Sequence, residues 1–383
     1  MDTCYLDNAA TSYPKAPGVS DAMKYYIDRV GANINRSVYG AACEAGLKTL
    51  GLRERLARFF AFPGKASHVI LTPGNTYSLN TVIGGFLKPG DRVLVSSMEH
   101  NAVMRPLNAI AGITVDRVPC DGEGRLDPDA IRPLIKRETK LCVMAHASNV
   151  SGTVQDAGAV GSILAEYGIP FVLDAAQTAG HIPVDFDKLR LSALCVPGHK
   201  GLLGPQGIGA LLLDDAFAQK LSPVITGGTG SASHTEIQPP FLPDRFESGT
   251  ANIPGIYGLD AAMAFIEKTG LDTLRAHELA LTERFLEGLR EIPRIRLAGP
   301  AGTDGRVGVI SLDFSPMDNA LAAQTLEEEY GILTRCGLHC APAAHRTLGS
   351  FPQGTVRFSL GYANTGEDVD RALDAIARCV SAK

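Results

Sequence analysis

One lysine stands at the junction between an apolar run and a segment rich in glycine. Lys200 follows Pro197-Gly198-His199 and precedes glycines at which the backbone can approach a ligand closely. Apolar surroundings disfavour an ammonium ion and lower its pKa, so the amine of Lys200 can act as a nucleophile toward a carbonyl group. The alternative is an exposed lysine in a glycine-rich turn, and the residues upstream argue against it.

A carboxylate is placed 26 residues before this lysine, at the end of an apolar run. The run Phe171–Leu173 leads into Asp174, and Gln177 follows shortly after. In a parallel sheet Asp174 would lie in the crevice at the carboxyl ends of the strands, where α/β proteins bind ligands. A buried carboxylate needs a cationic partner, and the pyridinium nitrogen of pyridoxal phosphate (PLP) is one that gains electron-withdrawing power from it. A helix cap or a salt bridge is the alternative role.

A phosphate site is predicted near residue 75. The run Val69–Thr72 ends at Pro73-Gly74, which permits a tight turn, and Asn75-Thr76 opens a helical pattern. Free N–H groups at a helix start attract an anion, although Asn and Thr are also common N-caps. A lysine, a carboxylate and a phosphate site together match one cofactor.

Two of the eight cysteines stand apart from the rest. Most lie alone in apolar stretches, as reduced and buried thiols do. Cys336 and Cys340 lie four residues apart among Arg, Gly and His, where a thiolate can be stabilised. A metal or redox module built from Cys336, His339 and Cys340 would have at most three ligands from one turn, and no CxxC partner occurs elsewhere. The expectation is therefore no metal.

Apolar, β-rich runs alternate with helical stretches through the first two-thirds of the chain. This order is typical of βαβ units and predicts a mostly parallel sheet buried on both faces. The predicted strands are His68–Thr72, Asp91–Ser96, Thr114–Pro119, Leu141–Ala147, Phe171–Asp174, Ala193–Val196 and Ile208–Leu213, with helices at Asp127–Arg137 and Asp156–Tyr167.

A second, smaller α/β domain is predicted after a long loop over Thr226–Pro243 that is rich in Gly, Ser, Thr and Pro. The division places residues 15–255 in the large domain and residues 1–14 and 256–383 in the small one. The predicted elements are helices at Ile253–Lys268, Leu271–Leu289, Asp318–Tyr330 and Glu367–Val380 and strands at Val307–Phe314, Ile332–Arg335 and Val356–Leu360.

Length and charge exclude several classes of function. The chain has 383 residues, and 36 basic against 41 acidic residues give a net charge of −5. That charge provides no broad positive field for nucleic acid or an anionic membrane. Apolar runs fall short of the roughly 20 residues that cross a bilayer, and the first residues lack a signal-peptide pattern. The sequence therefore predicts a cytosolic, enzyme-sized protein with neither nucleic acid nor membrane as a partner.

These residues together resemble one enzyme superfamily. The sequence is similar to the class V aminotransferases of PLP fold-type I and, among them, most resembles the cysteine desulfurases and selenocysteine lyases with a short active-site loop. The resemblance runs in order along nearly the whole chain and rests on Asp7–Thr11, Gly74–Thr76, Glu99–Ala102, Ser148–Gly152, Asp174–Gln177, Gly198–Lys200, Arg245–Thr250 and Arg335–Ala341.

The resemblance implies a role for each matching residue. Lys200 would hold PLP covalently, Asp174 would pair with its ring nitrogen, and His100 would stack on the ring as a further catalytic residue. The remaining cofactor contacts would come from Asn75, Thr76 and His199 at the phosphate, from Asn149 and Gln177 at the phenolic oxygen, and from Thr250 at the cofactor of a partner subunit. A homodimer is therefore expected.

The resemblance also implies the substrate contacts and the reaction. Arg357 would take the substrate carboxylate, as a planar guanidinium fork suits, and Asn33 would be a further substrate-binding residue. Cys340 matches the desulfurase cysteine in an Arg-x-Gly-x-x-Cys-Ala pattern, so it would accept sulfur from L-cysteine as a persulfide and release alanine. An amino-acid substrate and a sulfur-acceptor protein are the expected partners.

Alternatives remain open at this level. Selenocysteine lyase, lyase action on another thiol compound and epimerase activity fit the same framework. Asn35, Tyr39 and Leu338 replace histidines that are common in short-loop relatives, and Pro197 replaces a small hydroxyl residue. Cys336 would either exchange sulfur with Cys340 or be an incidental small residue of a strand.

Overall fold

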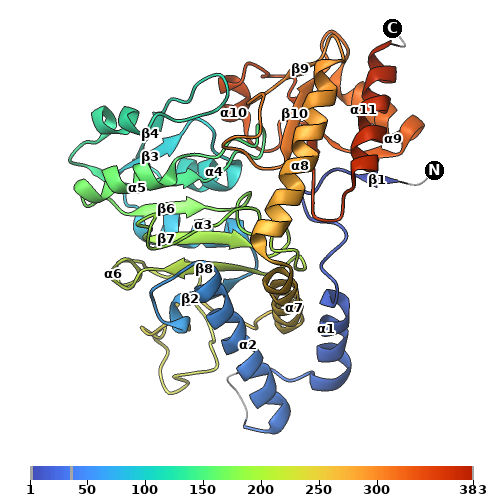
Figure 1. The fold of residues 1–383 in the computed structure, drawn as a ribbon. Coiled ribbons are helices and arrows are strands. Elements are labelled where there is room, and N and C mark those ends of the chain that lie inside the picture. The colour runs from blue at the N-terminus through green and yellow to red at the C-terminus, as the bar shows by residue number, and fades with distance from the viewer. Residues whose placement is uncertain (1–2, 35–37, 382–383) are drawn as a thin grey trace.

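A seven-stranded sheet forms the centre of the computed structural model, which describes residues 3–34 and 38–381 (Figure 1). Its order is β2-β8-β7-β6-β5-β3-β4, and neighbouring strands are parallel except where β8 pairs with β2 and β7. The predicted strands form it with ends shifted by at most two residues: β2 Val69–Thr72, β3 Arg92–Ser96, β4 Thr114–Val118, β5 Thr139–Ala145, β6 Phe171–Asp174, β7 Ala193–Pro197 and β8 Gly209–Leu213.

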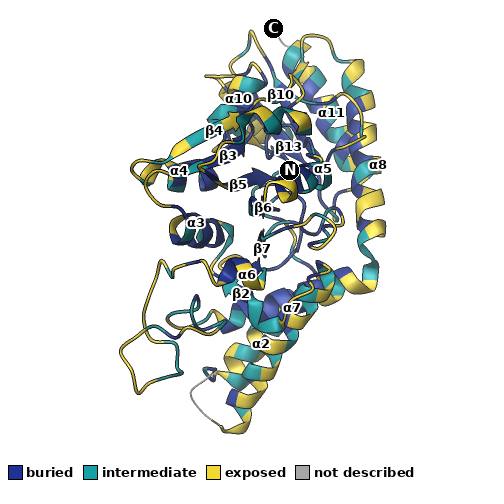
Figure 2. Ribbon diagram, turned by 90° about the vertical axis from the view of Figure 1, so that its left-hand side faces the viewer, coloured by how far each residue is buried: buried dark blue, intermediate teal, exposed yellow. Residues whose placement is uncertain are grey.

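Helices cover both faces of this sheet, which explains why its strands are apolar throughout (Figure 2). Side chains of a strand alternate between faces. Leu212 packs in the core formed with α2 (Gly40–Phe59), α5 (Ala157–Glu166) and α7 (Ile253–Thr269). The adjacent Leu211 packs in the core formed with α3 (Asn75–Phe86) and α4 (Asn101–Ala109). Three shorter helical segments are α1 (Val19–Tyr25), α6 (Asp215–Ala218) and the π-helical Tyr26–Val30.

The predicted helix over residues 127–137 was wrong in type and length. The structure has a 3₁₀-helix over Pro128–Leu134, with Asp127 as its N-cap and Pro133 inside it. Proline lacks the backbone N–H that an α-helix requires and clashes with the preceding turn. The apolar spacing was therefore read correctly as helical, but its prolines limit it to a short and tighter form.

The C-terminal third builds a second sheet against its own helices. This sheet has the order β12-β13-β10-β9 and is antiparallel, and β1 pairs in parallel with β11. Its core joins Phe285, Leu312 and Phe358. The elements are β1 Cys4–Tyr5, α8 Leu271–Arg290, β9 Arg296–Leu297, β10 Val309–Asp313, α9 Asn319–Tyr330, β11 Ile332–Leu333, β12 Arg335–Gly337, α10 Pro342–Thr347, β13 Thr355–Ser359 and α11 Gly366–Ser381.

The seven-stranded and the four-stranded sheet form a large and a small part of the chain, as the predicted α/β architecture requires. The chain start also belongs to the small part: Cys4 pairs with Ile332 in the separate two-stranded sheet, and Asp7 forms a bridge to Ser359 at the end of β13. Helix α7, however, packs in the core of the large sheet through Ile256, Leu259 and Met263, although the predicted boundary assigns it to the small domain. The division at residue 255 stays a prediction.

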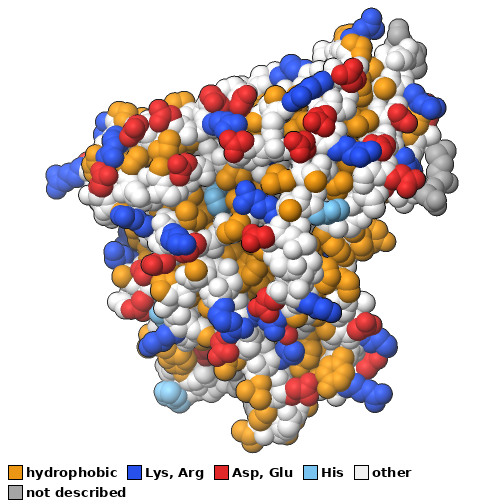
Figure 3. All heavy atoms as spheres, viewed as in Figure 1, with side chains coloured by type: hydrophobic (Ala, Val, Ile, Leu, Met, Phe, Trp, Pro, Cys, Tyr) orange, Lys and Arg blue, Asp and Glu red, His pale blue; other side chains and the backbone are white. Residues whose placement is uncertain are grey.

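The surface and the loops complete the arrangement. The segment over residues 226–243 contains no helix or strand, as predicted. Basic and acidic side chains intermingle over the face shown in Figure 3. No helix in the described part of the chain is both long and apolar enough to cross a membrane.

Candidate active site

A cavity of about 390 Å³ opens at the carboxyl ends of β5, β6 and β7. This is the edge where open α/β sheets bind their ligands. The structure brings together here every residue predicted to contact the cofactor except Thr250. The cavity is lined by Asn75, Thr76, His100, Asn149, Asp174, Gln177, His199 and Lys200, together with Pro73, Gly74, Tyr77, Ala102, Ala145, Ala147, Ala176, Pro197, Gln206 and Gly207.

Lys200 lies three residues beyond the end of β7, on a tightly packed turn. Burial lowers the pKa of its amine to about 8; Asp174 opposes this change, while Arg357 and Arg335 add to it. A lysine with such a pKa carries a substantial neutral fraction near neutral pH, which a nucleophile or a base requires.

Asp174 ends β6 and is buried beside Lys200. Its Oδ1 accepts hydrogen bonds from the Ala176 N–H at 2.9 Å and from Asn75 Nδ2 at 2.7 Å. Burial raises the pKa of Asp174, although these two donors and Lys200 favour its charged form. A cation placed in the cavity would stabilise this carboxylate further.

Two buried polar atoms in the cavity wall lack partners among the described residues. They are Asn75 Oδ1 and His199 Nδ1. Burial, with Lys200 and Lys15 nearby, lowers the pKa of His199 to about 4, so its imidazole is neutral. Asn75 and Thr76 open α3, whose first N–H groups have no partner within the helix. Free N–H groups at a helix start fit a ligand with an anionic group, whereas the oxygen of Asn75 needs a hydrogen-bond donor, because buried polar atoms are normally hydrogen-bonded. Asp174 fits a ring cation.

His100 is the N-cap of α4 and is held by its own helix. The N–H of Ala102 donates to Nδ1 of His100 at 2.9 Å, which places the ring proton on Nε2. Burial, and then Lys200, lower the pKa of His100 to about 4. The preceding Glu99 is fully buried and accepts hydrogen bonds from the N–H groups of Ser96 and Ala145. Glu99 thus joins the ends of β3 and β5.

Arg357 comes to this site from β13 of the second sheet. Its Nη2 donates to Asp7 Oδ1 at 2.7 Å and its Nη1 to the Asn149 carbonyl at 3.1 Å, while its buried Nε has no partner among the described residues. Arg335 stands directly opposite Arg357 in the strand pair. Like charges at such positions repel, and Asp7 balances only one of them. This corner of the site therefore favours an additional anion.

Cys340 is exposed on a short loop that is tied to the cavity wall. The Asn149 amide donates to the His339 carbonyl at 2.7 Å, and the Asn101 N–H donates to the Cys340 carbonyl at 2.7 Å. His339 and Cys340 have φ values of 47° and 57°. Each non-glycine residue in this left-handed region costs about 1–2 kcal/mol, so surrounding contacts must hold the loop in this form.

Cys336 lies on the other side of β12 from Arg335. Neighbouring residues of a strand point to opposite faces. Arg335 acts on Lys200 and His100 in the site, whereas burial, and then Asp318 at the start of α9, raise the pKa of Cys336. Across the described ranges, no group of three or more His, Cys, Asp or Glu side chains is placed to hold a metal ion.

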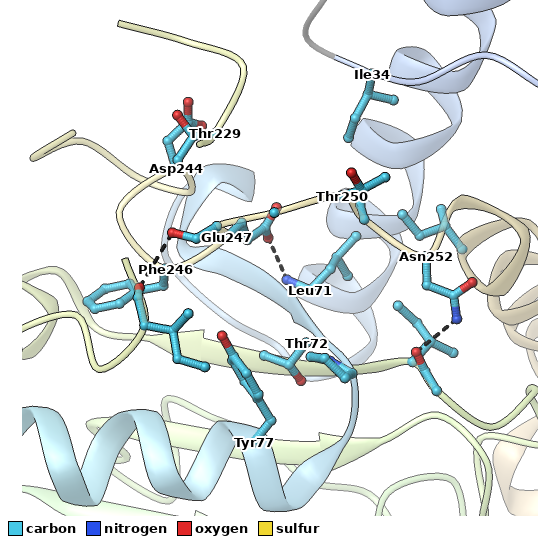
Figure 4. A pocket seen from close by; sticks show the side chains of 18 of the residues that line it. Ile34, Leu71, Thr72, Tyr77, Thr229, Asp244, Phe246, Glu247, Thr250 and Asn252 are labelled. Atoms are coloured by element: carbon cyan, nitrogen blue, oxygen red, sulfur yellow. Dashed lines mark hydrogen bonds between the residues drawn. The ribbon is translucent and has the colours of Figure 1, made fainter. Parts of the chain in front are cut away.

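Thr250 and Asn33 lie apart from the cofactor cavity, in a neighbouring pocket of about 300 Å³ (Figure 4). This pocket shares Pro73, Tyr77 and Gly207 with the cavity. Thr250 is exposed on the segment after Glu247, whose carboxylate bonds the N–H of Leu71 and the guanidinium of Arg53. Asn35, one of the substitutions noted in the sequence, lies outside the described residues.

Sequence reasoning assigned no role in the cofactor or substrate site to several residues that shape it, and it considered His339 only as a ligand of the rejected metal module. Asp7 and Arg335 occur in recognised motifs, but their pairing with Arg357 depends on contacts between distant segments. Glu99 precedes a predicted site histidine. Its carboxylate follows shortly after an apolar strand, and this pattern could have identified it as a site residue. His339 precedes Cys340, and only its left-handed backbone and buried ring distinguish it.

Comparison with known proteins identifies the class that this fold and site define. The aminotransferase class-V family matches residues 4–372. The chain belongs to the class V aminotransferases, so the α/β fold and the resemblance predicted from the sequence are confirmed.

Three similar proteins are named as cysteine desulfurases or probable cysteine desulfurases. A probable cysteine desulfurase from Pyrococcus abyssi is 34% identical, with 99% of this chain and 95% of that protein covered. A cysteine desulfurase from Haloferax volcanii is 32% identical over 97% of this chain and 88% of its own length. The apo structure of the cysteine desulfurase from Thermococcus onnurineus superposes with a TM-score of 0.93 at 32% identity, covering 100% of this chain and 95% of that one.

Proposed function

We propose that this chain is a PLP-dependent cysteine desulfurase that converts L-cysteine to L-alanine and collects the sulfur on Cys340. One observation carries the proposal: Lys200 and Asp174 face one cavity, and the loop of an exposed cysteine is bonded to the wall of that cavity. The names of the relatives support the same activity.

The cofactor would be held by the groups around the cavity. Lys200 would bind PLP covalently, Asp174 would face its ring nitrogen, and Asn75, Thr76 and His199 would surround its phosphate. Asn149, Gln177 and the His100 ring would complete the contacts. Bound PLP acts as an electron sink that weakens bonds at the Cα and Cβ of an amino acid. Burial raises the pKa of Asp174, so a cationic ring nitrogen beside it would stabilise its carboxylate form.

The substrate would be oriented through its carboxylate. Arg357 offers an Nε that has no partner in the described part of the chain, and it faces Arg335 across the strand pair. An amino-acid carboxylate would therefore relieve the repulsion between the two guanidinium groups. Asp7 fixes the guanidinium before substrate arrives. Asn33 is a further contact in this proposal, from the neighbouring pocket.

Proton transfer would use the amine of Lys200, and the imidazole of His100 would act beside it as a hydrogen-bond donor. The neutral form of the Lys200 amine would remove a proton from Cα and return it, which a pKa near 8 allows close to physiological pH. His100 carries its proton on Nε2, because Nδ1 accepts a backbone bond. That tautomer can donate a hydrogen bond toward the substrate.

Sulfur transfer would end on Cys340. Its thiolate forms a bond to the substrate sulfur while the bond between that sulfur and Cβ breaks. The electron pair of the broken bond stays with the carbon fragment, which takes up protons and leaves as alanine. The persulfide then passes its outer sulfur to a thiol of an acceptor protein or of a reductant. Exposure of Cys340 permits that second encounter.

A homodimer is part of the proposal. Thr250 is exposed and lies outside the cofactor cavity of its own chain, so its contact would be with the cofactor of a second copy.

The test is a set of turnover measurements on the purified holoenzyme. With L-cysteine and a reductant, alanine and sulfide should form in equal amounts. Lys200→Ala should abolish both products, and Cys340→Ser should abolish sulfide release while leaving the cofactor spectrum intact. Sulfide release that survives Cys340→Ser would contradict the proposal and favour direct lyase action. A parallel assay with L-selenocysteine identifies the preferred substrate.

A further inference from the structure

A buried histidine lies next to the exposed cysteine on the same loop. His339 is 5% exposed, and its Nε2 lies 3.1 Å from Thr355 Oγ1. Burial, followed by the charge of Arg357, lowers the pKa of His339 to about 2, so the ring is neutral and acts through hydrogen bonding and packing. The ring of His345, buried behind it, stands 5.5 Å from the ring of His339.

The partner of this histidine is on the strand that carries the predicted carboxylate-binding arginine. Thr355 and Arg357 are two residues apart on β13, so their side chains share one face of the sheet. The contact between His339 and Thr355 therefore connects the Cys340 loop to the same strand face that presents Arg357.

Hydrogen bonds to the main chain of the Cys340 loop include one within it, from the Ala341 N–H to the Leu338 carbonyl at 2.8 Å. The two carbonyl groups that flank the Cys340 position are each held by one hydrogen bond, from Asn149 and from Asn101. Two successive non-glycine residues in the left-handed region persist only where the surroundings determine them. Of these two residues, His339 has the buried side chain, and that side chain contacts Thr355, whereas Cys340 is exposed.

We propose that His339 is a positioning residue for the sulfur-transfer step: its contact with Thr355 holds the Cys340 loop so that the thiol meets the substrate sulfur. This inference rests on the proposed role of Cys340 as the sulfur acceptor. His339 touches neither substrate nor cofactor in this account and acts through the loop. Its loss should slow sulfur transfer and leave the preceding steps unaffected.

Two substitutions of His339 separate the hydrogen bond from the rest of the side chain. The amide nitrogen of glutamine reaches the position of Nε2, whereas that of asparagine reaches only the position of Nδ1. His339→Gln can therefore keep the contact with Thr355, and His339→Asn cannot. Thr355→Val removes the same contact from the other side with a side chain of equal shape, and it serves if His339→Asn fails to fold.

The experiment measures two steps in each holoenzyme. Persulfide formation on Cys340 is followed in a single turnover with L-cysteine by rapid quench and peptide mass. Exchange of the Cα proton of L-alanine in D₂O, followed by NMR, reports the step that does not involve Cys340. In His339→Asn and Thr355→Val, persulfide formation should fall about 10- to 100-fold, as for a misplaced reactive group. Proton exchange and the KM for cysteine should stay within about twofold, and His339→Gln should retain most of the wild-type rate.

Particular outcomes overturn the inference and are distinct from failure of the proposed function. Persulfide formation within twofold of wild type in both His339→Asn and Thr355→Val would refute the positioning role, as would equal losses in His339→Gln and His339→Asn. Parallel losses of persulfide formation and proton exchange would show a general structural role instead. Absence of a Cys340 persulfide in the wild-type enzyme would refute the proposed function itself.

Discussion

Gly180 tests how closely the Lys200 segment is packed against the turn that follows β6. Its φ is +86°, and a Cβ added there would lie 2.1 Å from the carbonyl oxygen of Gly201. The neighbouring atom belongs to the main chain, so the clash cannot be relieved by rotating a side chain. Gly180→Ala must therefore shift the residue next to Lys200.

The expected cost of Gly180→Ala has two parts. An alanine in the left-handed region costs about 1–2 kcal/mol, and overpacking of a filled interior adds about 1–3 kcal/mol. Gly168 supplies a matched control, because its φ is +63° but no atom lies within 4 Å of an added Cβ. Gly168→Ala should therefore cost only the first part.

Urea unfolding of the two variants and the wild type measures the difference. Gly180→Ala should lower the free energy of unfolding by about 2–5 kcal/mol, and Gly168→Ala by about 1–2 kcal/mol, with unchanged m values. Gly180→Ala should also lose affinity for PLP, since the displaced turn carries Lys200. Equal destabilisation in both variants, with normal cofactor binding in Gly180→Ala, would refute the packing argument.

Three further predictions concern ion pairs and the second thiol. Burial opposes protonation of His181, but Glu278 at 2.8 Å raises its pKa above 6.5. The ion pair should therefore stabilise the fold fully below pH 6.5 and lose this effect as the pH rises through the folded-state pKa of His181. The free energy of unfolding of His181→Gln, measured in urea, should lack this pH dependence. Asp7→Ala leaves Arg357 buried without its anion, so it should cost about 3–5 kcal/mol in the same titration. Cys336→Ser should leave sulfide release and persulfide lifetime unchanged, because Cys336 faces α9; a changed lifetime in mass analysis would contradict this.

The sheet could be predicted from sequence because its strands obey a simple rule. Runs such as Val172–Leu173 and Leu211–Leu213 are buried on both faces, so each reads as a continuous apolar segment. The α-helix predicted over residues 127–137 was wrong because the spacing of apolar residues indicates a helix, whereas Pro133 excludes a regular α-helix at that point. Very short strands such as β1 and β9 carry too few residues to show a period.

The cofactor cavity could also be predicted, because its residues follow strand ends that meet at one edge. Lys200 and Asp174 are close for this reason. Other contacts join segments with no sequence relation: Asp7 meets Arg357 from 350 residues away, and Asn75 turns its amide to Asp174 across 99 residues. The periodicity of a sequence carries no information on such pairings. The left-handed backbone at His339 could not be predicted either, because the residue is not a glycine.

The most direct test of the central claim is the mass of the Cys340 peptide after one turnover of the holoenzyme with L-cysteine in the absence of reductant. The proposed function predicts one additional sulfur atom on that peptide and one alanine released per modified site. Release of one alanine per active site while the Cys340 peptide keeps its original mass would contradict the proposed function.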